Sequence, residues 1–117
     1  MSDPCAHGSL EGGIAVACRP ARLGDVPAMR ELINGYAARD LMLPRTNAEL
    51  YEVVRDFLVL EAEVGGLVGC AAVHIVTGSM AELRSLAVAE AGRGRGLGRV
   101  LVEACCRAAR ELGLQKL

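Results

Sequence analysis

A glycine-rich segment near the end of the chain has the residue types that bind phosphate groups. In Arg93-Gly94-Arg95-Gly96-Leu97-Gly98, glycines alternate with arginines directly before an apolar segment with helical spacing. Glycine lets the backbone approach a ligand closely, and the free N–H groups of a helix's first turn point outward with the positive end of its dipole. Such a turn suits a phosphate or a pyrophosphate.

Three nucleotide-binding motifs compete for this segment. A P-loop requires G-x-x-x-x-G-K-[ST], and the sequence contains no Gly-Lys-Ser/Thr. A dinucleotide fingerprint requires G-x-G-x-x-G and an acidic residue about twenty positions later, but the glycines here are spaced G-x-G-x-G and the chain ends 19 residues after Gly98. The third motif, R-x-x-G-x-G, is matched by Arg93, Gly96 and Gly98. This match resembles the acetyl-CoA signature of the GCN5-related N-acetyltransferases.

Two interpretations without a cofactor stay open for the same segment. Arg-Gly repeats also occur in disordered RNA-binding segments, but those are longer, interleaved with aromatic residues and not followed by an apolar helix. A glycine turn can also be a simple tight connection that matches a short motif by chance. The expected strand before this loop and the expected helix after it favour the cofactor-binding interpretation.

The hydrophobic pattern predicts the elements that position this loop. It indicates an α/β (α+β) fold with a mixed, mostly antiparallel sheet flanked by helices, in the order β-α-α-β-β-β-α-β. The expected strands cover 14–18, 58–64, 67–76 and 82–88, the expected helices cover 25–38, 46–57 and 97–112, and 114–117 opens a last strand.

Short local signals support these bounds. Asp25 can cap the first helix, and Thr46 and Glu49 form a T-x-x-E capping box that opens the second. The pair Gly65-Gly66 readily supplies the positive φ of a tight hairpin turn. Gly113 ends the last helix, as a left-handed cap would.

The resemblance to the GCN5-related family extends over roughly 16–117 and implies direct attack of a primary amine on the thioester of acetyl-CoA, the co-substrate, without a metal. In this family the strand before the loop pairs with the pantetheine arm as an added strand would, which assigns that role to Leu86-Ala87-Val88. By the same resemblance, backbone amides from Arg93 to Gly98 hold the pyrophosphate, with Arg95 and Arg99 near its phosphates. Solvation at the surface is the alternative role for both arginines.

The implied reaction requires a base, because an ammonium group cannot attack. Glu82 begins the strand that would carry the thioester, where family members often have a base; an exposed strand-end carboxylate is the alternative. His74 is a second candidate, although a histidine in so apolar a strand is more often a hydrogen-bonded core residue. No cysteine has a clear base partner, which argues against a covalent acetyl-enzyme. Tyr36 and Tyr51 are expected to pack in the early helices.

A second block concerns the acceptor. Asp40-Leu41-Met42-Leu43-Pro44-Arg45-Thr46, with 50–52, 55–57 and 69–72, resembles the acetyltransferase domain of N-acetylglutamate synthases, which begin arginine biosynthesis, and especially their short bacterial form. This resemblance implies that the acceptor is the α-amino group of L-glutamate and that Arg45 binds a substrate carboxylate, which fits the fork of a guanidinium. Ser79 departs from the lysine that some synthases have nearby. Another small amine, a solvated Arg45 and a non-catalytic fragment that binds a partner stay open as alternatives.

Composition bounds the remaining possibilities. A formal net charge of -1 and a pI near 6.1 provide no field that would attract nucleic acid or an anionic membrane. The apolar stretches are shorter than a membrane span, and 1–13 lacks the pattern of a secretory signal, so we expect a cytoplasmic protein. The five cysteines form no C-x-x-C pair, which predicts reduced thiols and no metal site.

The two ends of the chain also carry expectations. Residues 1–13 are polar and aperiodic and are expected to form a flexible tail before an acetyltransferase domain at 14–117. The expected last strand has only 114–117, so the domain would lack its carboxy-terminal part and one wall of the cofactor cleft. An apolar sheet edge left open in this way favours a homo-oligomer or another partner.

Overall fold

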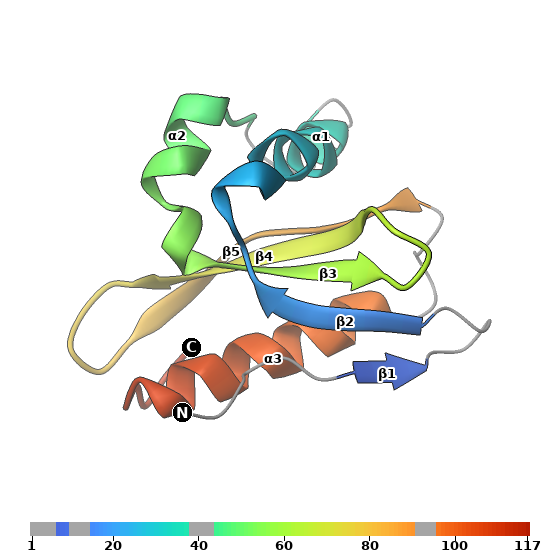
Figure 1. The fold of residues 1–117 in the computed structure, drawn as a ribbon. Helices are drawn as coiled ribbons and strands as arrows, with labels where there is room; N and C mark the ends of the chain where they lie inside the picture. Colours follow the sequence, from blue (N-terminus) through green and yellow to red (C-terminus); the bar gives the residue numbers. More distant parts are fainter. Residues whose placement is uncertain (1–6, 10–14, 38–43, 91–95) are drawn as a thin grey trace.

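The computed structural model describes residues 7–9, 15–37, 44–90 and 96–117. Its elements, with η marking a short 3-10 helix, are β1 (His7–Ser9), β2 (Ala15–Pro20), η1 (Leu23–Asp25), α1 (Val26–Ala37), α2 (Asn47–Glu52), η2 (Val54–Asp56), β3 (Phe57–Ala62), β4 (Leu67–Ile75), β5 (Ala81–Val88) and α3 (Leu97–Glu111). The strands form one antiparallel sheet in the order β1-β2-β3-β4-β5. Helices α1 and α2 cover one face of this sheet, and α3 covers the other (Figure 1).

The predicted order of elements is confirmed from β2 to α3, and the structure differs from the prediction after α2 and at both ends. The helix expected over 46–57 ends at Glu52, because Val54–Asp56 form a short 3-10 turn and Phe57 already begins β3. His7–Ser9, expected in a flexible tail, pair with Ala15–Ala17 of β2, which gives the edge groups of β2 a partner. At the other end, 114–117 makes a single parallel bridge between Met80 and Lys116 instead of a strand. Lys116 makes both hydrogen bonds of this bridge: its N–H donates to the carbonyl of Ser79 at 3.1 Å and its carbonyl accepts from the N–H of Ala81 at 3.0 Å.

Both faces of the sheet are buried, which explains why its strands are apolar on both sides. In β3, Leu58 and Leu60 belong to the core beneath α3, whereas Phe57 and Val59 belong to the core beneath α1 and α2. All four of these side chains are buried. The two-residue alternation of a strand therefore distributes one apolar run between two cores.

The predicted turn and cap signals are confirmed. Gly65 and Gly66 have φ values of 103° and 84° in the β3–β4 turn, and Gly113 has φ 88° after α3. The backbone N–H of Glu49 donates to Thr46 Oγ1 at 3.2 Å, and the backbone N–H of Thr46 donates to Glu49 Oε1 at 3.2 Å. This reciprocal capping box fixes the start of α2 and hence the position of the residue before it.

An ion pair fixes the start of α1 against β2. The guanidinium of Arg19 donates two hydrogen bonds to the carboxylate of Asp25, at 2.7 and 2.9 Å, and the backbone N–H of Arg22 donates a third at 2.7 Å. The hydrogen bonds from Arg19, with the smaller contribution from Arg22, hold the pKa of Asp25 below its ordinary value. The carboxylate of Asp25 thus caps the short turn η1 that leads into α1, and not α1 itself as the sequence predicted.

Gly69 in β4 leaves space for a side chain of α3 to pack directly against the backbone of the sheet. A Cβ atom there would lie 2.9 Å from Cδ1 of the buried Leu101 and 3.4 Å from the carbonyl oxygen of Ala87. We expect Gly69→Ala to lower the free energy of unfolding by about 1–3 kcal/mol, because the helix and sheet must move apart. Urea denaturation followed by circular dichroism measures this change.

Gly35 in α1 supplies a matched control, because a Cβ atom there would meet nothing within 4 Å. Gly35→Ala is expected to leave the urea midpoint unchanged or to raise it, since alanine favours a helix over glycine by about 1 kcal/mol. Equal midpoints for the two variants would contradict the close packing of α3 on β4.

Candidate active site

A β-bulge interrupts the pairing of β4 with β5. Ala72 pairs with Arg84 and Cys70 pairs with Ala87, so two residues of β5, Ser85 and Leu86, stand opposite one residue of β4. Ser85 has φ 54° and is the one non-glycine residue with positive φ in the described ranges. A bulge of this kind bends its strand, and strained backbone is concentrated at functional sites. The sequence analysis expected a regular strand here.

Arg45 reaches this bulge from the segment before α2. Its Nη1 donates to Ser85 Oγ at 3.2 Å, and its Nε lies 3.7 Å from Glu49 Oε2. The backbone of Arg45 is held by Asn34 of α1, whose Oδ1 accepts from the Arg45 N–H at 2.9 Å and whose Nδ2 donates to the Arg45 carbonyl at 3.2 Å. The structure therefore joins the predicted carboxylate-binding residue to the strand of the predicted base, through an asparagine that the sequence analysis did not identify.

Glu82 and Arg84 lie on the same face of β5 as this contact. Arg84 is opposite Ala72, which belongs to the core beneath α1 and α2, whereas Leu83 packs toward α3. Arg84 Nε donates to Glu82 Oε2 at 2.9 Å, and the two side chains are 46% and 52% exposed. The predicted base is thus accessible and ion-paired. This position fits both interpretations of Glu82, as a base and as an exposed carboxylate at the end of a strand.

His74 is the direct cross-strand partner of Glu82. Its Nδ1 lies 3.1 Å from Oδ2 of Asp56, at the end of η2, and its side chain is 36% exposed. The expectation that this histidine has a hydrogen-bond partner is confirmed, but it lies at the margin of the core. Directly opposed residues share a face of an antiparallel sheet, so His74 borders the same polar surface as Glu82 and Arg84.

Strand β5 leads from this polar surface to the start of α3. Gly96 has φ 79° and is the residue before α3, with no side chain capping the helix. The first N–H groups of an α-helix, here those from Leu97 to Arg99, have no partner within the helix, and an anion at such a position can accept from them. The side chain of Leu97 is buried in the core and that of Arg99 is exposed. Arg93, Gly94 and Arg95 lie outside the described residues, and their role stays a prediction.

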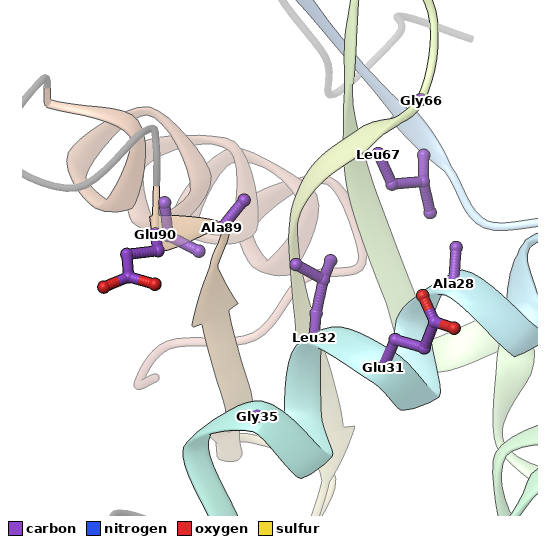
Figure 2. A pocket seen from close by; sticks show the side chains of 9 residues that line it. Ala28, Glu31, Leu32, Gly35, Gly66, Leu67, Ala89 and Glu90 are labelled. Atoms are coloured by element: carbon purple, nitrogen blue, oxygen red, sulfur yellow. The ribbon is translucent and has the colours of Figure 1, made fainter. Parts of the chain in front are cut away.

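A cavity of about 560 Å³ lies beside the end of β5 (Figure 2). Its lining comes from α1, from the turn before β4 and from the segment that follows β5, and consists of Ala28, Glu31, Leu32, Gly35, Gly66, Leu67, Val88, Ala89 and Glu90. The walls are apolar apart from two carboxylates, which Figure 2 shows on either side of Leu32. Such a lining suits an uncharged chain better than a phosphate. The sequence analysis did not identify this cavity, because its wall from α1 is the outer side of a packing helix.

Tyr51, expected to pack, is 45% exposed on α2. Within the described ranges, His, Cys, Asp and Glu side chains form no group of three or more that could hold a metal ion. No helix in the described part of the chain has the length and apolar character needed to cross a membrane.

The cysteines in the described ranges are free thiols. Two of them, Cys70 and Cys105, are poor nucleophiles because burial disfavours the thiolate. Cys70 lies beneath the bulge with Sγ 3.7 Å from the carbonyl oxygen of Ser85, and burial raises its pKa to about 12. Burial also raises the pKa of Cys105 in α3 to about 12. The thiolate is the nucleophilic form of cysteine, so neither residue is suited to form a covalent acetyl-enzyme.

Comparison with known proteins agrees with this fold. Residues 27–117 match the model of the acetyltransferase (GNAT) family. An amino-acid acetyltransferase of Mycobacterium tuberculosis is 38% identical over 106 residues, which are 86% of this chain and 60% of that protein. The family match extends from α1 through β5 to α3 and beyond, more than three quarters of the chain. The chain belongs to the acetyltransferase (GNAT) family.

Two crystal structures resemble the chain. One, a Mycobacterium tuberculosis protein in complex with CoA and NLQ, superimposes with a TM-score of 0.78 at 37% identity, over 83% of this chain and 59% of that one. The other, N-acetylglutamate synthase from Neisseria gonorrhoeae complexed with coenzyme A and N-acetyl-glutamate, gives a TM-score of 0.80 at 30% identity, over 85% of this chain and 23% of that one. The chain therefore spans at most about 60% of the length of these relatives.

The raised pKa values of Cys70 and Cys105 predict the pattern of thiol alkylation. The thiolate fraction stays small until the pH approaches about 12, so iodoacetamide should leave both residues unmodified in the folded protein at pH 8 and at pH 10. Cys106, which is only partly buried, should react first, and all three should react in urea. Peptide mass spectrometry measures each site. Labelling of Cys70 as fast as that of Cys106 in the folded protein would contradict its position beneath the bulge.

Proposed function

We propose that this chain provides the acetyl-CoA-binding part of an N-acetyltransferase that acetylates the α-amino group of L-glutamate, as an N-acetylglutamate synthase of arginine biosynthesis does. The observation that carries the proposal is the bulge at Ser85. Arg45, whose guanidinium suits a carboxylate, contacts Ser85 at this bend of β5, the strand that precedes α3 in the chain. Membership of the acetyltransferase family and the relatives crystallised with CoA support the cofactor.

The cofactor has a continuous path along β5. Its pyrophosphate would bind the first N–H groups of α3, where the helix dipole favours an anion, with Arg99 exposed nearby. Its pantetheine arm would lie along Leu86-Ala87-Val88, next to the largely apolar cavity. β5 is the last strand of the described sheet, so a ligand that adds to it as a strand displaces no strand of that sheet. The bulge then bends β5 where the thioester would lie.

The chemistry requires a base near the thioester. Glu82 would accept the proton of the substrate ammonium, directly or through a water molecule. The neutral amine then attacks the carbonyl carbon of the thioester, a C–N bond forms, the C–S bond breaks and CoA leaves as the thiolate. Arg84 holds the carboxylate of Glu82 on the same face of the sheet as Arg45, which would orient the substrate by one of its carboxylates.

Gly96→Ala tests the anion site at the start of α3. The backbone at Gly96 has φ 79°, so a side chain strains it and displaces the first N–H groups of the helix. We expect calorimetry to show acetyl-CoA affinity reduced at least about tenfold, the effect of losing one charge-assisted hydrogen bond. Gly113→Ala imposes the same strain at the other end of α3, at φ 88°, and should reduce stability without changing the affinity. Equal affinities for both variants would rule out this site.

Arg45→Ala tests the substrate site. Losing a charge-assisted bond of about 1.5–3 kcal/mol should raise KM for glutamate, while acetyl-CoA affinity stays close to that of the unmodified protein. Release of CoA thiol measures turnover. Arg110→Ala, which removes an exposed arginine from α3, is the control for nonspecific loss of charge. The proposal fails for glutamate if the Arg45 and Arg110 variants have the same KM, or if the acceptor is not acetylated by the unmodified protein.

A further inference from the structure

The ion pair between Glu82 and Arg84 has features that folding stability does not explain. The two residues are two positions apart on β5, so their side chains leave the same face of the sheet. Arg84 Nε and Glu82 Oε2 are 2.9 Å apart, while both side chains are about half exposed. An ion pair this accessible to water contributes little to stability. Its accessibility leaves both charged groups open to a ligand.

The pair still has hydrogen-bonding capacity. A guanidinium carries five N–H donors in one plane, and Arg84 uses Nε toward Glu82. In the part of the chain that the structure describes, no protein acceptor binds its two terminal nitrogens and no donor binds Glu82 Oε1. A carboxylate acceptor and a bidentate cationic donor therefore lie side by side on one surface.

This arrangement is complementary to an α-amino acid. The ammonium and carboxylate groups of an α-amino acid are attached to one carbon, so a site for both needs an anion and a cation at close spacing. Glu82 and Arg84 provide them in this order along the strand. An amine without an α-carboxylate would use only one member of the pair.

Arg45 adds a second cation next to the same pair. It contacts Ser85, the residue that follows Arg84, from a different element of the fold. Its nearest carboxylate, that of Glu49, is 3.7 Å from Nε, a longer separation than in the pair on β5. Two guanidiniums, those of Arg45 and Arg84, therefore border the bulge, each within ion-pair distance of one protein carboxylate. A dicarboxylic amino acid would bring one carboxylate of its own to each guanidinium.

We propose that Arg84 is a specificity-determining residue that binds the α-carboxylate of the substrate, while Glu82 receives the ammonium group and Arg45 binds the side-chain carboxylate. This inference rests on the proposed function. It predicts that the substrate site of that enzyme prefers α-amino acids with two carboxylates. His74 with Asp56 borders the pair on the side of β4.

The test compares three acceptors that differ by one group each. L-Glutamate has both carboxylates, 4-aminobutanoate lacks the α-carboxylate, and L-glutamine has an amide in place of the side-chain carboxylate. Arg84→Gln should lower kcat/KM for glutamate at least about tenfold more than kcat/KM for 4-aminobutanoate, because both reactions lose the contact of Arg84 with Glu82 but only glutamate also loses a charge-assisted bond. Arg84→Lys should restore part of the preference for glutamate.

Arg45→Gln is the matched variant. It should remove the preference for glutamate over glutamine and keep the preference for glutamate over 4-aminobutanoate. If Arg84→Gln lowers kcat/KM for glutamate and 4-aminobutanoate by the same factor, Arg84 only positions Glu82 and the inference is overturned. If turnover is too slow to follow, calorimetry on the CoA-saturated protein gives the dissociation constant of each acceptor. The ratios of these constants between acceptors then replace the ratios of kcat/KM in the test of Arg84. Failure to bind or acetylate any of the three acceptors would overturn the proposed function itself.

Discussion

The register change between β4 and β5 is the constraint on which the site depends. With two residues of β5 opposite one of β4, the strand bends and Ser85 takes a left-handed backbone conformation. That conformation turns its hydroxyl toward Arg45 and its carbonyl oxygen toward Cys70. An unbulged strand would shift the following residues to the opposite faces of the sheet, because side chains alternate with a period of two. The bulge therefore decides which of the two cores Ala87 and Val88 each enter.

Helices α1 and α2 fix the position of Arg45, the residue that contacts Ser85 in the bulge. Asn34 of α1 binds both backbone groups of Arg45, and the capping box of α2 begins at the next residue. Arg45 is thus fixed on both sides before its side chain reaches Ser85, and little conformational entropy remains to be lost when it binds a ligand. The ion pair of Arg19 with Asp25 in turn fixes the start of α1 on β2. The position of one guanidinium is set by contacts that extend through three elements.

The sequence was informative where structure is local. The capping box of Thr46, the glycine pair of the β3–β4 turn and the left-handed cap at Gly113 depend on a few neighbouring residues, and each was predictable from residue type. The bulge was not, because serine is not a signal for positive φ and the register change results from packing against two cores. The contact of Arg45 with Ser85 joins residues 40 positions apart, and the pairing of Arg84 with Glu82 depends on which face of β5 is covered. Pattern analysis identified Arg45 and Glu82 separately but gave no reason to place them together.

In the proposed complex, acetyl-CoA binds along β5 and at the start of α3. Amide hydrogen exchange with and without acetyl-CoA tests this binding mode most directly, because it measures the protection of each backbone N–H separately. The account predicts that exchange slows on adding the cofactor at Leu97–Arg99 and along the second half of β5, and stays unchanged in β2 and at the end of α3. Protection confined to other elements, or none at saturating acetyl-CoA, would contradict it.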